Sequence, residues 1–110
     1  MESYVIVLTT CRSNEEAQSI IDRVLKARLI ACATIIAPVY SHFRWQGEIS
    51  SEDEVMVVMK TRKKLLNELT EWIQVHHSYE VPEIIALPII GGSKEYLEWV
   101  REETTSDWGE

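Results

Sequence analysis

The chain has 110 residues, of which 18 are acidic and 11 are basic, so its formal net charge is −7. A chain of this length forms one ordinary domain, and its composition, 45% hydrophobic and 26% charged, is typical of a packed globule. The acidic balance excludes an ordinary nucleic-acid surface, because phosphate binding needs clustered lysine and arginine. We therefore expect a single domain over residues 1–110 with no nucleic-acid partner.

Three features of the sequence indicate the cellular compartment of the protein. No stretch approaches the 18 or more apolar residues of a membrane span, so no membrane partner is expected. Two cysteines are too few for a disulfide framework. The first three residues lack the basic segment of a secretory signal. These features together predict a reduced, cytoplasmic protein.

The first half of the chain alternates between strand and helix patterns. Residues 4–10 form a β-branched apolar run that predicts a buried strand. Ser13 and Glu16 have the spacing of a capping box, which predicts the start of an amphipathic helix. Residues 30–45 are then predicted to be extended, with Pro38 at a bulge or an edge position.

The middle of the chain predicts a hairpin followed by a helix. Residues 46–47 and the polar stretch 50–54 are interpreted as the turn region, and residues 55–59 as the returning strand. Helical periodicity begins at Lys63, and Pro82 with the residue before it is predicted to break this helix.

The last third predicts one more strand and a final helix. Residues 83–90 form the strand, and Pro88 places it at a sheet edge. Residues 91–93 introduce the helix, and residues 104–110 follow as a frayed or docked tail. The order β-α-β-β-α-β plus a terminal helix predicts an α+β, ferredoxin-like fold with two helices on one sheet face.

The predicted strands contain more apolar surface than one copy of the chain covers. A strand covered on one face should alternate apolar and polar residues, yet residues 4–8 and 55–59 are nearly continuous apolar runs. The face of the sheet opposite the helices therefore needs a further cover. This pattern predicts self-association through the sheet.

Metal-ligating side chains are few and scattered, and no C-x-x-C or H-x-x-x-H pair occurs. Cys32 is interpreted as a small buried hydrophobe, and His76, on the apolar stripe of its helix, as structural. His77, beside the helix end, is predicted to be exposed and functional. Cys11 lies before a helix start and next to Arg12, so it is either an incidental thiol or a partly activated one.

The segment 77–83 concentrates polar groups between a helix and a strand. It contains a histidine, a tyrosine, two carboxylates and a proline, and binding groups collect in such loops when rigid elements flank them. The alternative is that Tyr79 and Glu80 only cap the helix or pair with Lys60. Composition alone leaves both interpretations open.

Six short sequence pieces occur in a recognisable order. They are RLIACA at 28–33, W-x-G-E at 45–48, KT at 60–61, HSYEVPEI at 77–84, LPI at 87–89 and YL-x-W at 96–99. With these pieces, the chain resembles the CutA family, the divalent-cation tolerance proteins, over about residues 4–101. Ser78 replaces the usual proline of the H-P-Y-E motif, and Arg12 stands where the first loop usually has a proline.

The resemblance implies a ferredoxin-like fold assembled as a tight homotrimer, tolerance of divalent metals, copper binding in some members and no established enzymatic reaction. It places His77 at the motif histidine and Cys32 at the cysteine of an L-x-A-C pattern. The first-strand cysteine of copper-binding members falls at Thr9, with Cys11 two residues later; this offset reverses the side-chain face if the strand bends there. The family is also similar in architecture to the trimeric PII signalling proteins.

Three functional hypotheses follow. The first is a non-enzymatic homotrimer that weakly binds copper or another divalent metal ion through His77 with Cys11 or Cys32. The second is a signalling or scaffold trimer that holds an anionic ligand or a protein segment in an inter-subunit cleft. The third is a thiol enzyme that uses Cys11. The residues predicted for the cleft are Trp45, Lys60, Tyr79, Glu80 and Glu83.

Overall fold

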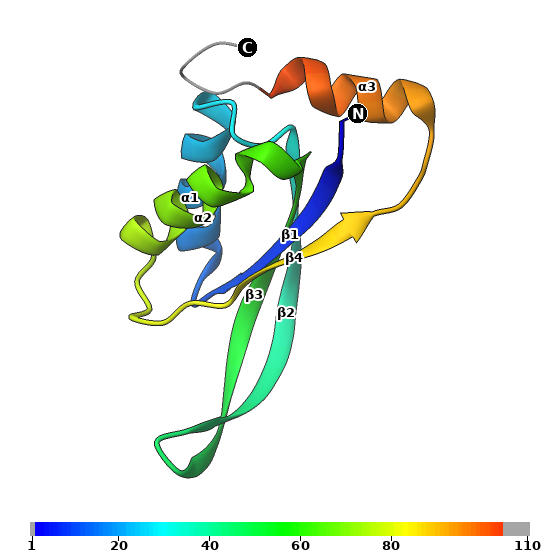
Figure 1. The fold of residues 1–110 in the computed structure, drawn as a ribbon. Helices are drawn as coiled ribbons and strands as arrows, with labels where there is room; N and C mark the ends of the chain where they lie inside the picture. The colour runs from blue at the N-terminus through cyan, green and yellow to red at the C-terminus, as the bar shows by residue number, and fades with distance from the viewer. Residues whose placement is uncertain (1, 105–110) are drawn as a thin grey trace.

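The computed structural model describes residues 2–104 (Figure 1). The predicted α+β order is confirmed, with a short 3₁₀ turn added before the second helix. The elements are β1 (Tyr4–Cys11), α1 (Asn14–Lys26), β2 (Cys32–Trp45), β3 (Glu48–Arg62), η1 (Lys63–Leu65), α2 (Leu66–His76), β4 (Ile84–Ile89) and α3 (Lys94–Glu103). No helix within this described range is long and apolar enough to cross a membrane. The predicted tail beyond Thr104 lies outside the described residues.

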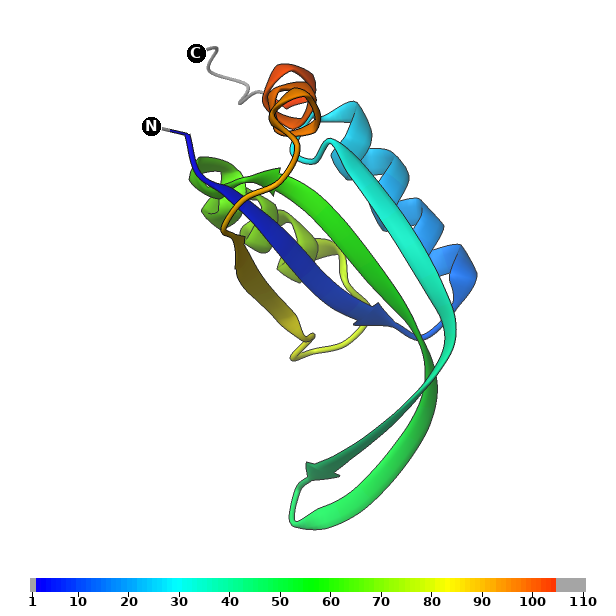
Figure 2. The ribbon, with the colours of Figure 1, turned by 90° about the vertical axis from the view of Figure 1, so that its right-hand side faces the viewer.

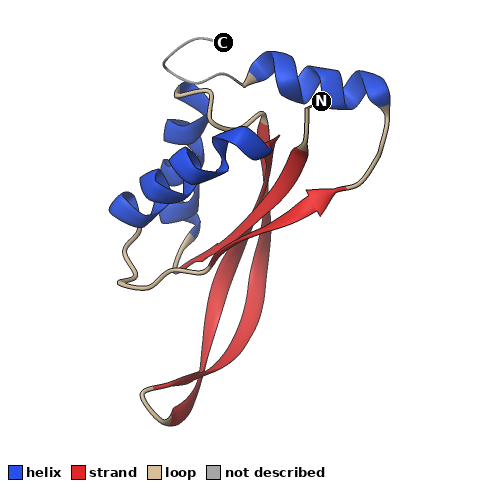
Figure 3. Cartoon of the chain, in the orientation of Figure 1, coloured by secondary structure: helices blue, strands red, loops and turns tan. Residues whose placement is uncertain are grey.

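The four strands form one antiparallel sheet in the order β2-β3-β1-β4. The first strand of the sequence is therefore central, and Val7 lies opposite Met59 on one side and Ala86 on the other. The strand that contains Pro88 lies at an edge, as predicted. Helices α1 and α2 pack on one face (Figures 1 and 3), and Figure 2 shows the opposite face, with α3 at its upper end.

The core lies between the sheet and helices α1 and α2. Burial alternates over residues 4–9 of β1 and 55–61 of β3, so every second side chain of these stretches faces the helices. The central members of this core are all fully buried: Val7, Val24, Val57, Met59, Leu69 and Ile73. On the opposite face Ile36, Ile85 and Leu87 remain about half exposed, so much of that apolar face stays open.

Two arginines hold the C-terminal end of α3. Arg62 is buried, and it donates hydrogen bonds from Nε to Thr104 Oγ1 at 2.9 Å and from a terminal nitrogen to the Thr104 carbonyl at 2.6 Å. Arg28 is exposed and donates to the carbonyls of Glu102 and Glu103. Cationic groups are favourable at this end of a helix, where carbonyls lack partners.

The β2–β3 hairpin differs from the prediction in the length of its turn. Only Gln46 and Gly47 form the turn, both with positive φ, and residues 50–54 belong to β3. A two-residue turn of this kind matches the twist of the flanking strands, so the polar residues continue as strand. They are polar because residues 39–54 form a two-stranded ribbon that projects beyond β1 (Figure 1). The predicted bulge at Pro38 is confirmed by a register shift between Ile36 and Val39.

Thr9 carries a buried hydroxyl without a partner among the described residues. We expect Thr9→Val to raise the free energy of unfolding by about 1 kcal/mol, because valine keeps the shape and removes an unsatisfied polar atom. Thr61 is equally buried, but its hydroxyl donates to the Leu29 carbonyl at 2.7 Å, so Thr61→Val should destabilise by about 1–3 kcal/mol. Denaturant titration of both variants measures these opposite signs. Equal signs would contradict the assignment of Thr9 as unsatisfied.

Candidate metal centre

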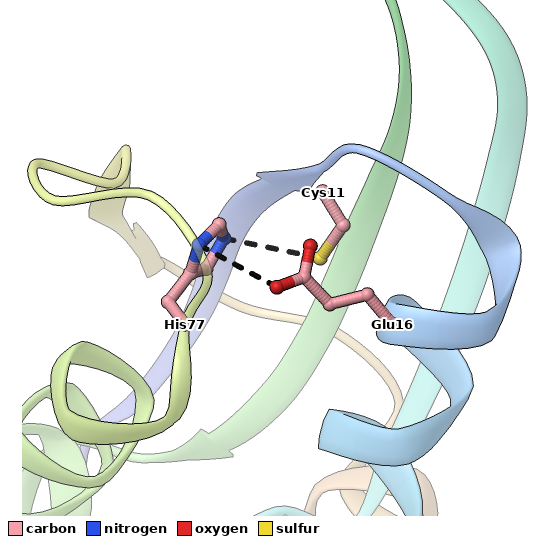
Figure 4. Close-up of side chains that lie close together, drawn as sticks. All are labelled: Cys11, Glu16 and His77. Atoms are coloured by element: carbon pink, nitrogen blue, oxygen red, sulfur yellow. Dashed lines mark hydrogen bonds and ion pairs between the residues drawn. The ribbon is translucent and has the colours of Figure 1, made fainter.

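Three side chains from distant parts of the sequence converge beside the end of β1. Cys11 is the last residue of β1, Glu16 lies in the first turn of α1, and His77 follows the last residue of α2. A ligating atom of each lies within 4.8 Å of the other two. Figure 4 shows the three side chains directed toward one another. The structure therefore brings His77 and Cys11 together, and their role as metal ligands stays a prediction.

The local sequence explains how Glu16 reaches this position. Ser13 caps α1 and accepts a hydrogen bond from the Glu16 amide at 3.1 Å, as the capping-box spacing predicted. The Glu16 carboxylate does not return to the Ser13 amide. It accepts from the Arg12 amide at 3.3 Å and, across the structure, from the Ser78 amide at 2.8 Å.

The two neighbouring histidines differ from the prediction in their exposure to solvent. His76, predicted to be structural, is exposed and stacks on Trp72 with ring centroids 3.8 Å apart. His77, predicted to be exposed, is buried. The cause is that α2 ends at His76, before the predicted break at Pro82, and the backbone of His77 is already extended. This turns the His77 ring away from solvent and toward β1.

Both ring nitrogens of His77 have hydrogen-bond partners. Nε2 lies 2.8 Å from the carbonyl oxygen of Thr10, which can only accept, so Nε2 carries the proton. Nδ1 accepts from the Tyr79 amide at 3.0 Å, so it holds the lone pair of a neutral imidazole. Nε2 also lies 4.0 Å from Cys11 Sγ, and Nδ1 lies 3.9 Å from Glu16 Oε2.

The electrostatics of the site keep the cysteine protonated. Burial, followed by the carboxylates of Glu16 and Glu54, raises the pKa of Cys11 to about 12. Burial also acts to raise the pKa of Glu16, but hydrogen bonds from Ser78 and Arg12 outweigh it and lower that pKa. Cys11 is therefore a poor nucleophile near neutral pH, which favours the incidental thiol over the partly activated one.

Cys32 does not join this cluster. It pairs with Lys60 on β3, whereas Cys11 pairs with Val55, five residues away along the same strand. Side chains alternate between the faces of a sheet, so Cys11 lies on the helix face and Cys32 on the open face. Cys32 is half-buried, and its Sγ lies 3.4 Å from the hydroxyl of Tyr96. The interpretation of Cys32 as a small buried hydrophobe was wrong about its burial.

Thr9 and Cys11 were expected to face opposite sides of the sheet only if the strand bends between them. β1 pairs with β3 in one continuous register from Tyr4 to Cys11, so the strand does not bend there. Thr9 and Cys11 therefore share the helix face of the sheet, and both are fully buried. Side chains two positions apart in a regular strand point to the same face of the sheet.

The predicted cleft residues remain apart within one chain. Trp45 lies half exposed at the tip of the hairpin, opposite Glu48, whereas Lys60 lies twelve residues further along β3. Tyr79 donates from its hydroxyl to Glu54 at 2.8 Å, and burial with this contact raises its pKa. The carboxylates of Glu80 and Glu83 are exposed. A cleft between subunits therefore stays a prediction.

Sequence reasoning missed two carboxylates of this region. Glu16 was assigned only to helix capping, and buried Glu54 was assigned to a turn. Glu16 could have been suspected because it follows Cys11 by five residues across a strand–helix junction. The contact of Glu54 with Tyr79 depends on tertiary structure that no local pattern reveals.

The structural relatives of the chain agree closely with its fold. A crystal structure of CutA1 from Oryza sativa matches with a TM-score of 0.91 and 35% identity, covering 94% of each chain. The divalent cation tolerance protein from Thermus thermophilus matches with a TM-score of 0.90 and 41% identity, covering 96% of this chain and all of that one. A protein from Archaeoglobus fulgidus that is described as periplasmic matches with a TM-score of 0.89 and 37% identity, covering 91% of this chain and 97% of that one.

The relatives found by sequence comparison are also CutA proteins. The chloroplastic protein CutA of Arabidopsis thaliana is 38% identical over 91% of this chain, which spans only 55% of that relative. The divalent-cation tolerance protein CutA of Thermus thermophilus is 41% identical over 90% of this chain and 96% of its own length. Since relatives are named for the chloroplast and the periplasm, a cytoplasmic location stays a prediction. The family model described as CutA1 divalent ion tolerance protein matches residues 5–103, and the chain therefore belongs to that family.

Proposed function

We propose that this protein is a non-enzymatic, cation-binding member of its family, and that it takes up a divalent metal ion at Cys11, Glu16 and His77. The observation that supports this is the convergence of a thiol, a carboxylate and an imidazole within 4.8 Å. Zinc accepts this combination of sulfur, oxygen and nitrogen ligands, and copper accepts its sulfur and nitrogen members.

The structure favours weak rather than tight binding. Metal ligation needs the thiolate, and a pKa of about 12 against an ordinary value of 9.0 makes this thiolate about a thousandfold less available. His77 must also give up at least one of its two hydrogen bonds. Because the thiol releases a proton on ligation, we expect the affinity to rise about tenfold per pH unit over the neutral range.

Equilibrium dialysis against Zn²⁺ tests the site with matched controls. His77→Ala and Cys11→Ala should each weaken zinc binding at least tenfold, because each removes a ligand. His76→Ala and Cys32→Ala alter the adjacent exposed histidine and the cysteine on the other sheet face, and they should leave the affinity within about twofold. Equal losses in all four variants, or no saturable binding by the parent protein up to millimolar zinc, would reject the proposal.

We also propose that the protein functions as a homotrimer. The support is the open sheet face, where three large apolar residues are about half exposed, and the projecting ribbon 39–54, where Tyr40, Trp45 and Ile49 are half exposed or more. An isolated two-stranded ribbon is marginally stable in water, so a neighbouring copy would support it. Light scattering should return about three times the monomer mass of 12.7 kDa. A monomer mass at micromolar concentration would contradict this proposal.

A further inference from the structure

The loop of residues 78–83, which joins α2 to β4, is held in place by very few interactions. It has no helical or strand structure. Among the described residues, no main-chain to main-chain hydrogen bond joins this loop to another segment. Its attachment therefore depends on hydrogen bonds that involve side chains and on side-chain packing, such as the Tyr79 ring against the His77 ring with centroids 4.9 Å apart.

Three such bonds hold the start of the loop. The Ser78 amide donates to Glu16 Oε2 at 2.8 Å, and the Tyr79 amide donates to His77 Nδ1 at 3.0 Å. The Tyr79 hydroxyl donates to Glu54 at 2.8 Å. Two of the three acceptors, Glu16 and His77, are also side chains of the candidate metal centre.

Ligation by His77 removes the acceptor of the Tyr79 amide whichever ring nitrogen is used. If Nδ1 binds the cation, its only lone pair is occupied and it can no longer accept from Tyr79. If Nε2 binds, its proton must leave, and a neutral imidazole then carries its proton on Nδ1, which becomes a donor. The second route also breaks the bond from Nε2 to the Thr10 carbonyl.

Glu16 is engaged in a similar way. Its Oε2 accepts from the Ser78 amide, and its Oε1 accepts from the Arg12 amide at the start of α1. Each carboxylate oxygen has two lone pairs, so a cation need not displace either amide, but it draws charge from the oxygen that it binds. A cation on Oε2 therefore weakens the bond from the loop, and a cation on Oε1 weakens the bond from the helix start. Cation binding and loop attachment thus use the same two side chains.

We propose that cation binding at Cys11, Glu16 and His77 releases loop 78–83 from the body of the protein. The inference rests on the proposed function, since it needs the cation to occupy that site. Occupancy of a buried centre would then change an exposed segment, in which Val81 is already 70% exposed. The loop is then attached to the protein when the site is empty and released when the site holds a cation.

Cation binding and loop release are coupled equilibria, and such coupling acts equally in both directions. If the cation loosens the loop, loosening the loop by other means must strengthen cation binding by the same coupling. Tyr79→Phe removes the hydroxyl bond to Glu54 without altering a ligand. We expect it to tighten zinc binding about three- to tenfold. Tyr96→Phe removes the hydroxyl near Cys32 on the open sheet face and should leave the zinc affinity unchanged.

Amide hydrogen exchange followed by NMR tests the release directly. At saturating Zn²⁺, the Tyr79 amide of the parent protein should exchange at least tenfold faster than without zinc, while the amide of core residue Leu69 should not accelerate. Unchanged or slower Tyr79 exchange with zinc bound, or Tyr79→Phe binding zinc no more tightly than Tyr96→Phe, would overturn this inference and leave the proposed function standing. Absence of zinc binding in dialysis would overturn both.

Discussion

Replacing Leu69 with alanine is expected to lower the free energy of unfolding by about 2–5 kcal/mol. Leu69 lies on α2, is fully buried, and belongs to the cluster that joins the helices to the sheet. Removing its side chain loses apolar contacts and leaves a cavity that the surrounding strands can only partly fill. Chemical denaturation at one fixed protein concentration, followed by circular dichroism, measures the loss.

Val75 provides a matched control on the same helix. Its side chain is 77% exposed, so Val75→Ala removes apolar atoms that are already in water. We expect a change within about 0.5 kcal/mol. If Val75→Ala destabilised as much as Leu69→Ala, the buried face of α2 would be wrongly assigned.

Replacing Arg62 with methionine is the second change with a large expected effect, a destabilisation of about 3 kcal/mol. Methionine keeps the apolar length of the side chain but cannot donate to the hydroxyl and carbonyl of Thr104, which is itself buried. The carbonyl loses a charge-assisted hydrogen bond and stays shielded from water. Unfolding experiments should show this loss, and limited proteolysis should show earlier cleavage within α3.

Arg28 is a control for the effect of burial, because it carries the same charge as Arg62 at the same helix end. It also donates to carbonyls at the end of α3, but it is exposed, so water replaces its hydrogen bonds when they are removed. Arg28→Met should cost less than about 1 kcal/mol. Comparable losses for Arg62→Met and Arg28→Met would show that desolvation is not the source of the Arg62 effect.

Most of the fold could be predicted because local patterns and tertiary structure agree. The capping spacing of Ser13 marks the start of α1, and Pro88 marks an edge strand, and both rules concern backbone groups that local sequence controls. The hairpin was less predictable. Residues 50–54 are polar because the ribbon is exposed, and polarity alone does not distinguish an exposed strand from a turn.

The candidate site could be predicted only in part. His77 and Cys11 were singled out because imidazole and thiol groups bind metals, and the structure brings them together. Glu16 joins them only after α1 folds back against the loop that follows α2, which places Glu16 beside Ser78, 62 positions further along the chain. The exchanged exposure of His76 and His77 has a similar origin, since one residue of helix length decides which ring faces the interior.

The central position of β1 has a consequence for how the protein is made. β1 is synthesised first, yet its pairing with β4 requires residues 84–89, near the end of the described chain. Contacts so distant in sequence close slowly, and the sheet cannot be completed while β4 is still inside the ribosome. Of the four strands in this sheet, the earliest to leave the ribosome therefore waits for the latest before both of its edges are paired, and until then one apolar edge is open to chaperones and to other nascent chains.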